Sequence, residues 1–143
     1  MRRVFFMLLL GIGVILFITG CSKVGDPVDE DNHVIDHSDN IFPVLVVNKP
    51  ANNQVLNNGD TIFVEGMVSD EKTMYRGRIK ISDDGNGFVV KEEFFETHIL
   101  QTINFNIFYK ANVSAMTDYT VLVEFEDHGL NKVYVTLKVK VNP

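Results

Sequence analysis

Hydrophobic and polar residues alternate along most of the chain after Pro43, in short runs separated by residues that favour turns. Five runs show a period of two: 62–68, 75–81, 103–109, 119–125 and 133–141. Successive side chains of a β-strand point to opposite faces, so each run predicts a strand with one buried and one solvated face. Half-buried strands of this kind are typical of antiparallel sheets.

The remaining segments complete an all-β pattern. Residues 44–47 are apolar and precede Lys49-Pro50, which predicts a sheet edge or the start of the fold, because proline donates no ladder hydrogen bond. Residues 88–90 with Phe94 and Phe95 predict a further strand or a covering loop. Asn- and Gly-rich turns lie at 57–60 and 83–87. About seven strands in roughly 100 residues favour a sandwich of two sheets, and no stretch has a helical period.

The amino terminus has the pattern of a secretory signal. Arg2 and Arg3 precede an apolar run at 4–18, and small residues follow it. The alternative is a membrane-spanning helix, but the run is shorter than the roughly 20 apolar residues that such a helix needs. We therefore expect residues 1–20 to be a signal peptide.

The run Ile18-Thr19-Gly20-Cys21 resembles the lipobox of bacterial lipoproteins. This resemblance implies cleavage before Cys21, lipidation of its sulfur, and acylation of the new amino group with a fatty acid such as palmitate. Each buried methylene stabilises attachment by ~0.8 kcal/mol, so several chains on Cys21 would give a lasting anchor. The membrane is thus an expected partner, and lipidation explains the single unpaired cysteine.

Residues 21–42 are expected to form a flexible tether between the lipidated cysteine and a domain at 43–143. The segment is acidic, is broken by Gly25 and Pro27, and contains too little apolar surface to offset the entropy of ordering it. Ser22 after the cysteine is similar to lipoproteins sorted to the outer membrane. The acidic cluster resembles the tethers of surface-displayed lipoproteins. We expect a lipid-anchored protein of the outer membrane, periplasmic or exposed at the cell surface.

Several segments after Pro43 resemble the immunoglobulin-like domains of bacterial surface and periplasmic lipoproteins. The resemblance implies an immunoglobulin-like antiparallel β-sandwich over residues 43–143. It implies no reaction, because close relatives include families of unknown function. The segments that carry it are Pro43–Val47, Pro50, Asn58–Ile62, Val64–Asp70, Asp118–Val121 and Asp127–Asn131.

Composition excludes several classes of function. The chain has a net charge of −6, and loss of Arg2 and Arg3 with residues 1–20 leaves 11 Lys and Arg against 19 Asp and Glu, or −8. Binding of nucleic acid depends on basic residues, so it is not expected. One cysteine excludes both a disulfide framework and a Cys-rich zinc site.

Two strand-end acids, Asp70 and Asp127, are the candidate calcium ligands, with Glu71, Asp118 and Glu126 as helpers. In related sandwiches such acids meet at one pole and offer oxygen ligands. The favoured interpretation is that they are solvated turn residues, since no closed loop supplies the six to eight oxygens that calcium needs. The loop at 83–87 looks like a calcium loop but fails the register, which favours a hairpin turn. No other cofactor is expected.

Histidines offer weaker candidates. His33 and His37 have a spacing that could hold zinc on a helix, but their segment lacks a helical pattern. His98 and His128 are candidate bases of a small hydrolase. Neither has a visible nucleophile, and no Gly-x-Ser-x-Gly motif is present.

Phe94, Phe95, Phe108 and Tyr134 are predicted to form an exposed aromatic patch for a glycan or protein partner. Absence of tryptophan weakens the glycan hypothesis, and packing against a loop or a second subunit is the alternative. An open edge strand could also accept a strand from a partner. The favoured function is a non-catalytic binding or structural module of the cell envelope. The alternatives are a glycan-binding accessory protein of polysaccharide uptake and a small hydrolase.

Overall fold

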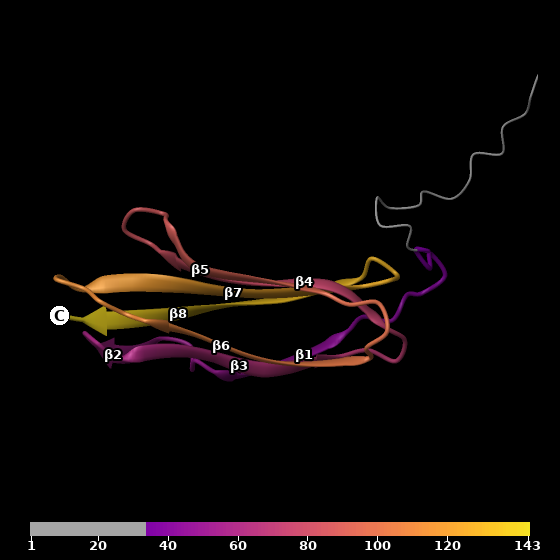
Figure 1. Cartoon of the computed structure of the whole chain (residues 1–143), viewed down its shortest axis with the longest axis horizontal. Coiled ribbons are helices and arrows are strands. Elements are labelled where there is room, and N and C mark those ends of the chain that lie inside the picture. Colours follow the sequence, from indigo (N-terminus) through magenta and orange to yellow (C-terminus); the bar gives the residue numbers. More distant parts are fainter. Residues whose placement is uncertain (1–33) are drawn as a thin grey trace, which may run out of the picture.

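The computed structural model describes residues 34–143, in which eight strands form two packed sheets (Figure 1). These residues contain no helix, and hence none that could span a membrane. The predicted signal peptide, Cys21, the tether up to residue 33 and His33 lie outside the described residues. The strands are β1 (Val44–Lys49), β2 (Gln54–Asn57), β3 (Thr61–Ser69), β4 (Met74–Asp83), β5 (Val89–Glu96), β6 (Thr102–Lys110), β7 (Thr117–Asp127) and β8 (Lys132–Asn142).

One sheet has the order β1-β3-β6 and the other the order β2-β8-β7-β4-β5. All five alternating runs form strands, namely β3, β4, β6, β7 and β8, which confirms the all-β prediction. β1 lies at the edge of the three-stranded sheet, as its proline-terminated sequence predicts. Within β3, Ile62 and Val64 are fully buried whereas Phe63 is 43% exposed, so the two faces of the strand alternate as expected.

Two details differ from the sequence-based prediction. The described residues hold eight strands instead of about seven, because the four-residue β2 adds to the edge of β8. This pair is parallel, whereas the prediction was for antiparallel pairing throughout. The stretch containing Phe94 and Phe95 is one continuous strand, β5, which confirms the strand of the two predicted alternatives. β2 is too short for a periodic pattern, and it is held through backbone pairing with residues 139–142 of β8.

The middle of the core is built on two pairs of glycine and phenylalanine. Gly66 of β3 is paired with Phe105 of β6, and Gly77 of β4 is paired with Phe125 of β7. A Cβ atom on Gly77 would lie 2.1 Å from Cδ1 of Phe125, so the ring occupies the space of the missing side chain. The rings of Phe105 and Phe125 stack with centroids 5.6 Å apart, and this contact joins the two sheets.

Tyr119, at the start of β7, makes the fold sensitive to alkaline pH. Burial, and then the neighbouring Tyr109, raise the pKa of the Tyr119 hydroxyl to about 12. The unfolded chain loses this proton near pH 10. The contribution of Tyr119 to the free energy of unfolding is therefore fully present below about pH 10 and is lost as the pH rises towards 12.

We expect Tyr119→Phe to remove this tyrosine's share of the alkaline loss of stability. Urea unfolding at about pH 9 and about pH 11, followed by circular dichroism, measures the loss. Tyr134→Phe is the matched control, because Tyr134 is 70% exposed. An equal alkaline loss in the wild type and the Tyr119 variant would contradict the assignment.

Candidate functional site

The segment that precedes β1 is fastened to the turn between β7 and β8. The backbone N–H of Asp36 donates to the carbonyl of His128 at 2.8 Å. The side-chain amide of Asn131 donates to the carbonyls of Asp39 and Ile41, both at 3.2 Å. Flexibility was expected here for lack of apolar residues, but hydrogen bonds to the β7–β8 turn hold the described part of the predicted tether.

Gly129 allows the close approach of this segment. A Cβ atom on Gly129 would lie 2.8 Å from Cβ of Asp39 and 2.9 Å from its carbonyl oxygen. The next residue, Leu130, adopts φ 65°, a left-handed conformation that completes the tight turn. As a result Asp39 is only 4% exposed, although it stands in a polar stretch of sequence.

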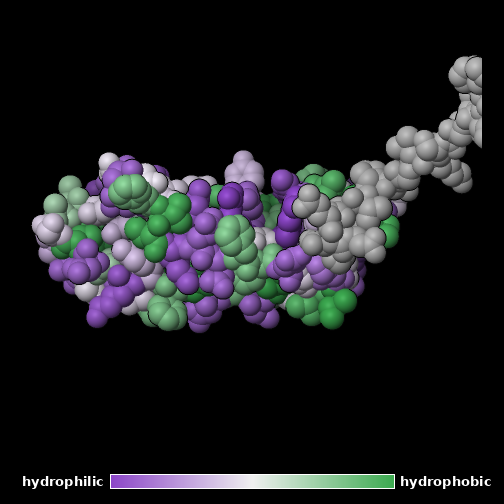
Figure 2. Space-filling model, turned by 45° about the horizontal axis from the view of Figure 1, so that its top comes forward, coloured by the Kyte–Doolittle hydropathy of each residue, from purple (hydrophilic) through white to green (hydrophobic). Residues whose placement is uncertain are grey.

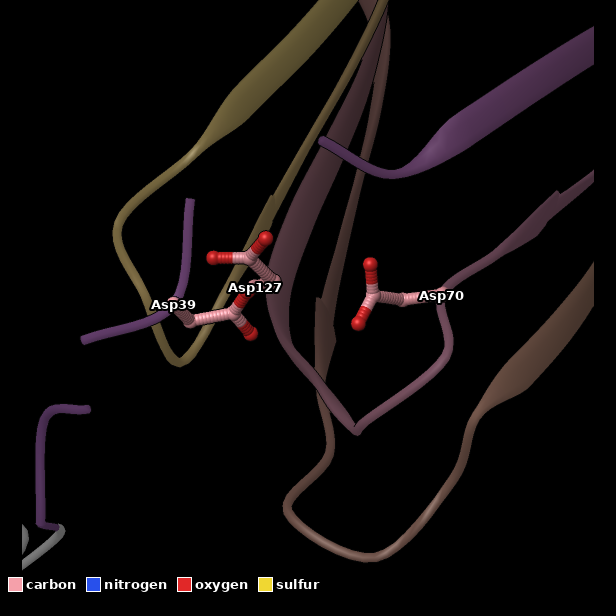
Figure 3. A group of neighbouring side chains, drawn as sticks. All are labelled: Asp39, Asp70 and Asp127. Carbon is pink, nitrogen blue, oxygen red and sulfur yellow. The ribbon is translucent and has the colours of Figure 1, made fainter. Parts of the chain in front are cut away.

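Three carboxylates meet at this pole of the molecule, from Asp39 before β1, Asp70 after β3 and Asp127 at the end of β7 (Figure 3). One oxygen atom of each lies within 4.8 Å of the others. The structure therefore brings together Asp70 and Asp127, the two candidate calcium ligands. Asp39 was not among the candidate ligands, because its neighbouring sequence does not distinguish it from the other acids of the predicted tether.

Backbone and amide groups hold each carboxylate from outside the cluster. Ile41 N–H donates to Oδ1 of Asp39 at 3.1 Å, and Lys72 N–H donates to Oδ2 of Asp70 at 2.8 Å. Asn131 donates to both oxygens of Asp127, at 2.9 and 3.0 Å. The other oxygens of the first two acids, Asp39 Oδ2 and Asp70 Oδ1, are buried and accept no hydrogen bond.

Lys72 forms an ion pair with one acid of the cluster, Asp39. Its ammonium group lies 3.6 Å from Asp39 Oδ2 and 2.8 Å from Asp36 Oδ2. The hydrogen bond from Lys72, with two further bonds from Ser38, lowers the pKa of Asp36 well below its usual range. Lys72 thus bonds directly to Asp36, at the rim, while its side chain is 42% exposed.

The predicted helper acids do not join this cluster. Asp118 lies at the other end of β7 and pairs with Lys140 at 3.1 Å. Glu126 precedes Asp127 on the strand, so it faces the opposite side, where it pairs with Arg76 at 2.8 Å. The carbonyl of Glu71 accepts a hydrogen bond from Gln101 at 2.7 Å, and its carboxylate is not part of the group.

The loop at 83–87 is a hairpin turn between β4 and β5, as its sequence favoured. The carbonyl of Asp83 accepts the N–H of Gly87 at 2.8 Å, and the Asp83 carboxylate accepts the N–H of Gly85 at 2.7 Å. Gly87 adopts φ 75°, which glycine allows at no steric cost. Both carboxylate oxygens of Asp83 therefore accept hydrogen bonds from groups within the turn itself.

The two candidate bases, His98 and His128, pack together with Tyr75. The ring centroids of the histidines are 5.6 Å apart, and each ring lies within 5.7 Å of the tyrosine ring. His98 Nε2 also lies 3.6 Å from a carboxylate oxygen of Glu96. These contacts form an aromatic cluster that joins β4 to the segments after β5 and β7.

The four predicted aromatic residues do not form one patch. Phe95 packs inward, with its ring 5.4 Å from that of Phe125, because neighbours on a strand face opposite sides. Phe108 is 65% exposed but belongs to the three-stranded sheet, where it is paired with Phe63. Only Phe94 and Tyr134 share a face.

That face is the outer side of the five-stranded sheet, which is mostly hydrophilic with separate hydrophobic side chains (Figure 2). Phe94 and Tyr134, each 70% exposed, flank Arg78 and Glu124 in one row across β5, β4, β7 and β8. Arg78 donates to Glu124 at 2.8 Å. A groove of about 430 Å³ adjoins the row and includes both phenylalanines of β5 and Lys132 in its lining.

No protein-family model matches this chain, and no curated protein matches it. Within residues 34–143, the candidate sites are the three-carboxylate cluster and the row formed by Phe94, Arg78, Glu124 and Tyr134.

Proposed function

We propose that the chain is a lipid-anchored protein of the cell envelope whose immunoglobulin-like domain is a non-catalytic binding or structural module. The observation that carries the proposal is the order of segments: the run Ile18–Cys21 directly follows a short apolar stretch, and a small two-sheet domain comes next. Lipidation of Cys21 would hold this domain at the outer membrane.

The strand order supports an immunoglobulin-like topology. β1, β3 and β6 correspond in position to strands A, B and E of that fold, and β8, β7, β4 and β5 to strands G, F, C and C′. β2 corresponds to a short strand A′ beside strand G. Tyr119, at the start of the strand that corresponds to F, has the place of the tyrosine of the tyrosine corner.

Metabolic labelling tests the anchor. The full chain, expressed in a Gram-negative host with an alkyne-tagged palmitate, should carry the label and sediment with the outer membrane. Cys21→Ser should abolish the label, because the lipid acceptor is lost, whereas Ser22→Ala should retain it as the matched control. An unlabelled wild type, or a labelled Cys21 variant, would overturn the proposal. Protease treatment of intact cells would then separate surface display from a periplasmic location.

A glycan-binding accessory role is the second candidate, and the row on the outer face favours it. Phe94 and Tyr134 offer exposed ring faces, and the Arg78–Glu124 pair between them offers polar groups for hydroxyls. Electrophoresis in polysaccharide-containing gels should show retardation that Phe94→Ala and Tyr134→Ala abolish. Phe108→Ala, on the other sheet, should migrate as wild type does. Retardation that survives in all three variants would count against this role.

A further inference from the structure

We infer that Asp39, Asp70 and Asp127 form a calcium site that clamps the segment before β1 to the pole of the sandwich. The site joins three parts of the chain that are far apart in sequence: the segment leading from the amino terminus, the end of β3 and the end of β7. A cation there would act as a cross-link at the place where the chain enters the domain.

The first argument is the pair of buried oxygens that accept no hydrogen bond. Asp39 is 96% buried, and its Oδ2 accepts no hydrogen bond, its charged neighbour being the Lys72 ammonium at 3.6 Å; the buried Oδ1 of Asp70 accepts none either. A buried carboxylate oxygen without a partner costs free energy, so such atoms call for a ligand. The bonds from Ile41 and Lys72 N–H hold the opposite oxygens and leave these two for that ligand.

The second argument is charge. Asp39, Asp70 and Asp127 bring three negative charges to atoms within 4.8 Å of one another. Asn131, which satisfies Asp127, is neutral, and the single ammonium of Lys72, which donates to Asp36 and lies 3.6 Å from Asp39 Oδ2, offsets at most one of the three charges. Repulsion between close carboxylates in a buried place is large, and a divalent cation removes it.

The donor set selects the kind of cation. All the ligand atoms are carboxylate oxygens, which suit hard cations, and no cysteine or histidine belongs to the group. Calcium accepts irregular oxygen geometry and completes its shell with water, whereas magnesium demands a near-ideal octahedron at shorter distances. Three acids from separate parts of the chain, with ligand atoms up to 4.8 Å apart, fit calcium better.

Thermal unfolding of the full chain in detergent, with calcium or with a chelator, tests the site. Calcium at about 100 times its Kd should raise the Tm by about 10 °C, because the ion binds only the folded state. Magnesium at the same concentration should have a much smaller effect. No shift with calcium, or an equal shift with magnesium, would overturn the assignment.

Three isosteric variants distinguish a metal site from a structural cluster. Asp39→Asn and Asp70→Asn keep the oxygen that accepts the backbone bond, and each should weaken calcium binding by about tenfold or more. In chelator the same variants should melt at or above the wild-type Tm, because a charge repulsion is removed. Asp60→Asn, in an exposed turn at the opposite pole, is the matched control and should bind calcium normally. Variants of Asp39 and Asp70 that retain wild-type affinity, or that only lower the Tm in chelator, would refute the inference.

Discussion

Replacing Phe125 by alanine should lower the free energy of unfolding by about 3–5 kcal/mol, the largest effect expected of any single substitution in the core. Phe125 is fully buried, and its ring contacts Phe95 within its own sheet and Phe105 in the other. The substitution leaves a cavity at the centre of the interface and breaks the stack that joins the sheets. Since small domains are stable by only about 5–15 kcal/mol, much of the total is lost.

Urea unfolding in chelator, followed by far-ultraviolet circular dichroism, measures this loss without a contribution from bound metal. Phe108→Ala is the matched control, because it removes the same side chain from an exposed position, and it should change stability by less than about 0.5 kcal/mol. Phe125→Leu leaves a smaller cavity and should lose about 1–2 kcal/mol, which keeps the test informative if the alanine variant fails to fold. Equal losses in the variants of Phe125 and Phe108 would contradict the description of the core.

The second large effect is expected from adding a single methyl group at Gly77. Gly77→Ala places a Cβ atom 2.1 Å from the ring of Phe125, far inside van der Waals contact. Because β4 lies between β5 and β7, neither the strand nor the ring can move freely. Overpacking of this kind costs about 3 kcal/mol, although alanine is otherwise the better strand residue.

A double variant separates overpacking from other causes. Phe125→Leu removes the atoms that the new methyl group strikes, so Gly77→Ala should cost clearly less in that background than in the wild type. Gly85→Ala, in the exposed β4–β5 turn, should change stability by less than about 0.5 kcal/mol. Additive losses in the double variant would show that the clash with Phe125 is not the cause.

The fold could be predicted largely from alternation, because alternation records directly which face of a strand is buried. It identified β3, β4, β6, β7 and β8. It could not identify β2, since four residues between turns carry no period and are held by backbone pairing with β8. Alternation applied more strictly would also have separated Phe94 from Phe95, because consecutive residues of one strand cannot share a face.

Only part of the candidate site could be predicted from the sequence. Asp70 and Asp127 were predicted because both follow apolar runs, and strand ends of a sandwich gather at its poles. The burial of Asp39 could not be predicted, because it depends on Asn131, 92 residues further along the chain. The sequence around Asp39 is polar on both sides, so the signal lies in tertiary contacts and not in local pattern.

The described chain begins at one pole of the sandwich and finishes with Pro143 at the other (Figure 1). β7 and β8, each of 11 residues, run the length between them, roughly 35 Å at about 3.3 Å per residue. Any fluorophore, tag or fused protein placed after Pro143 is therefore carried a full domain length from the pole where the described chain enters the sandwich. Such fusions convert the domain into a spacer of known reach, and several copies joined end to end would make a longer rod.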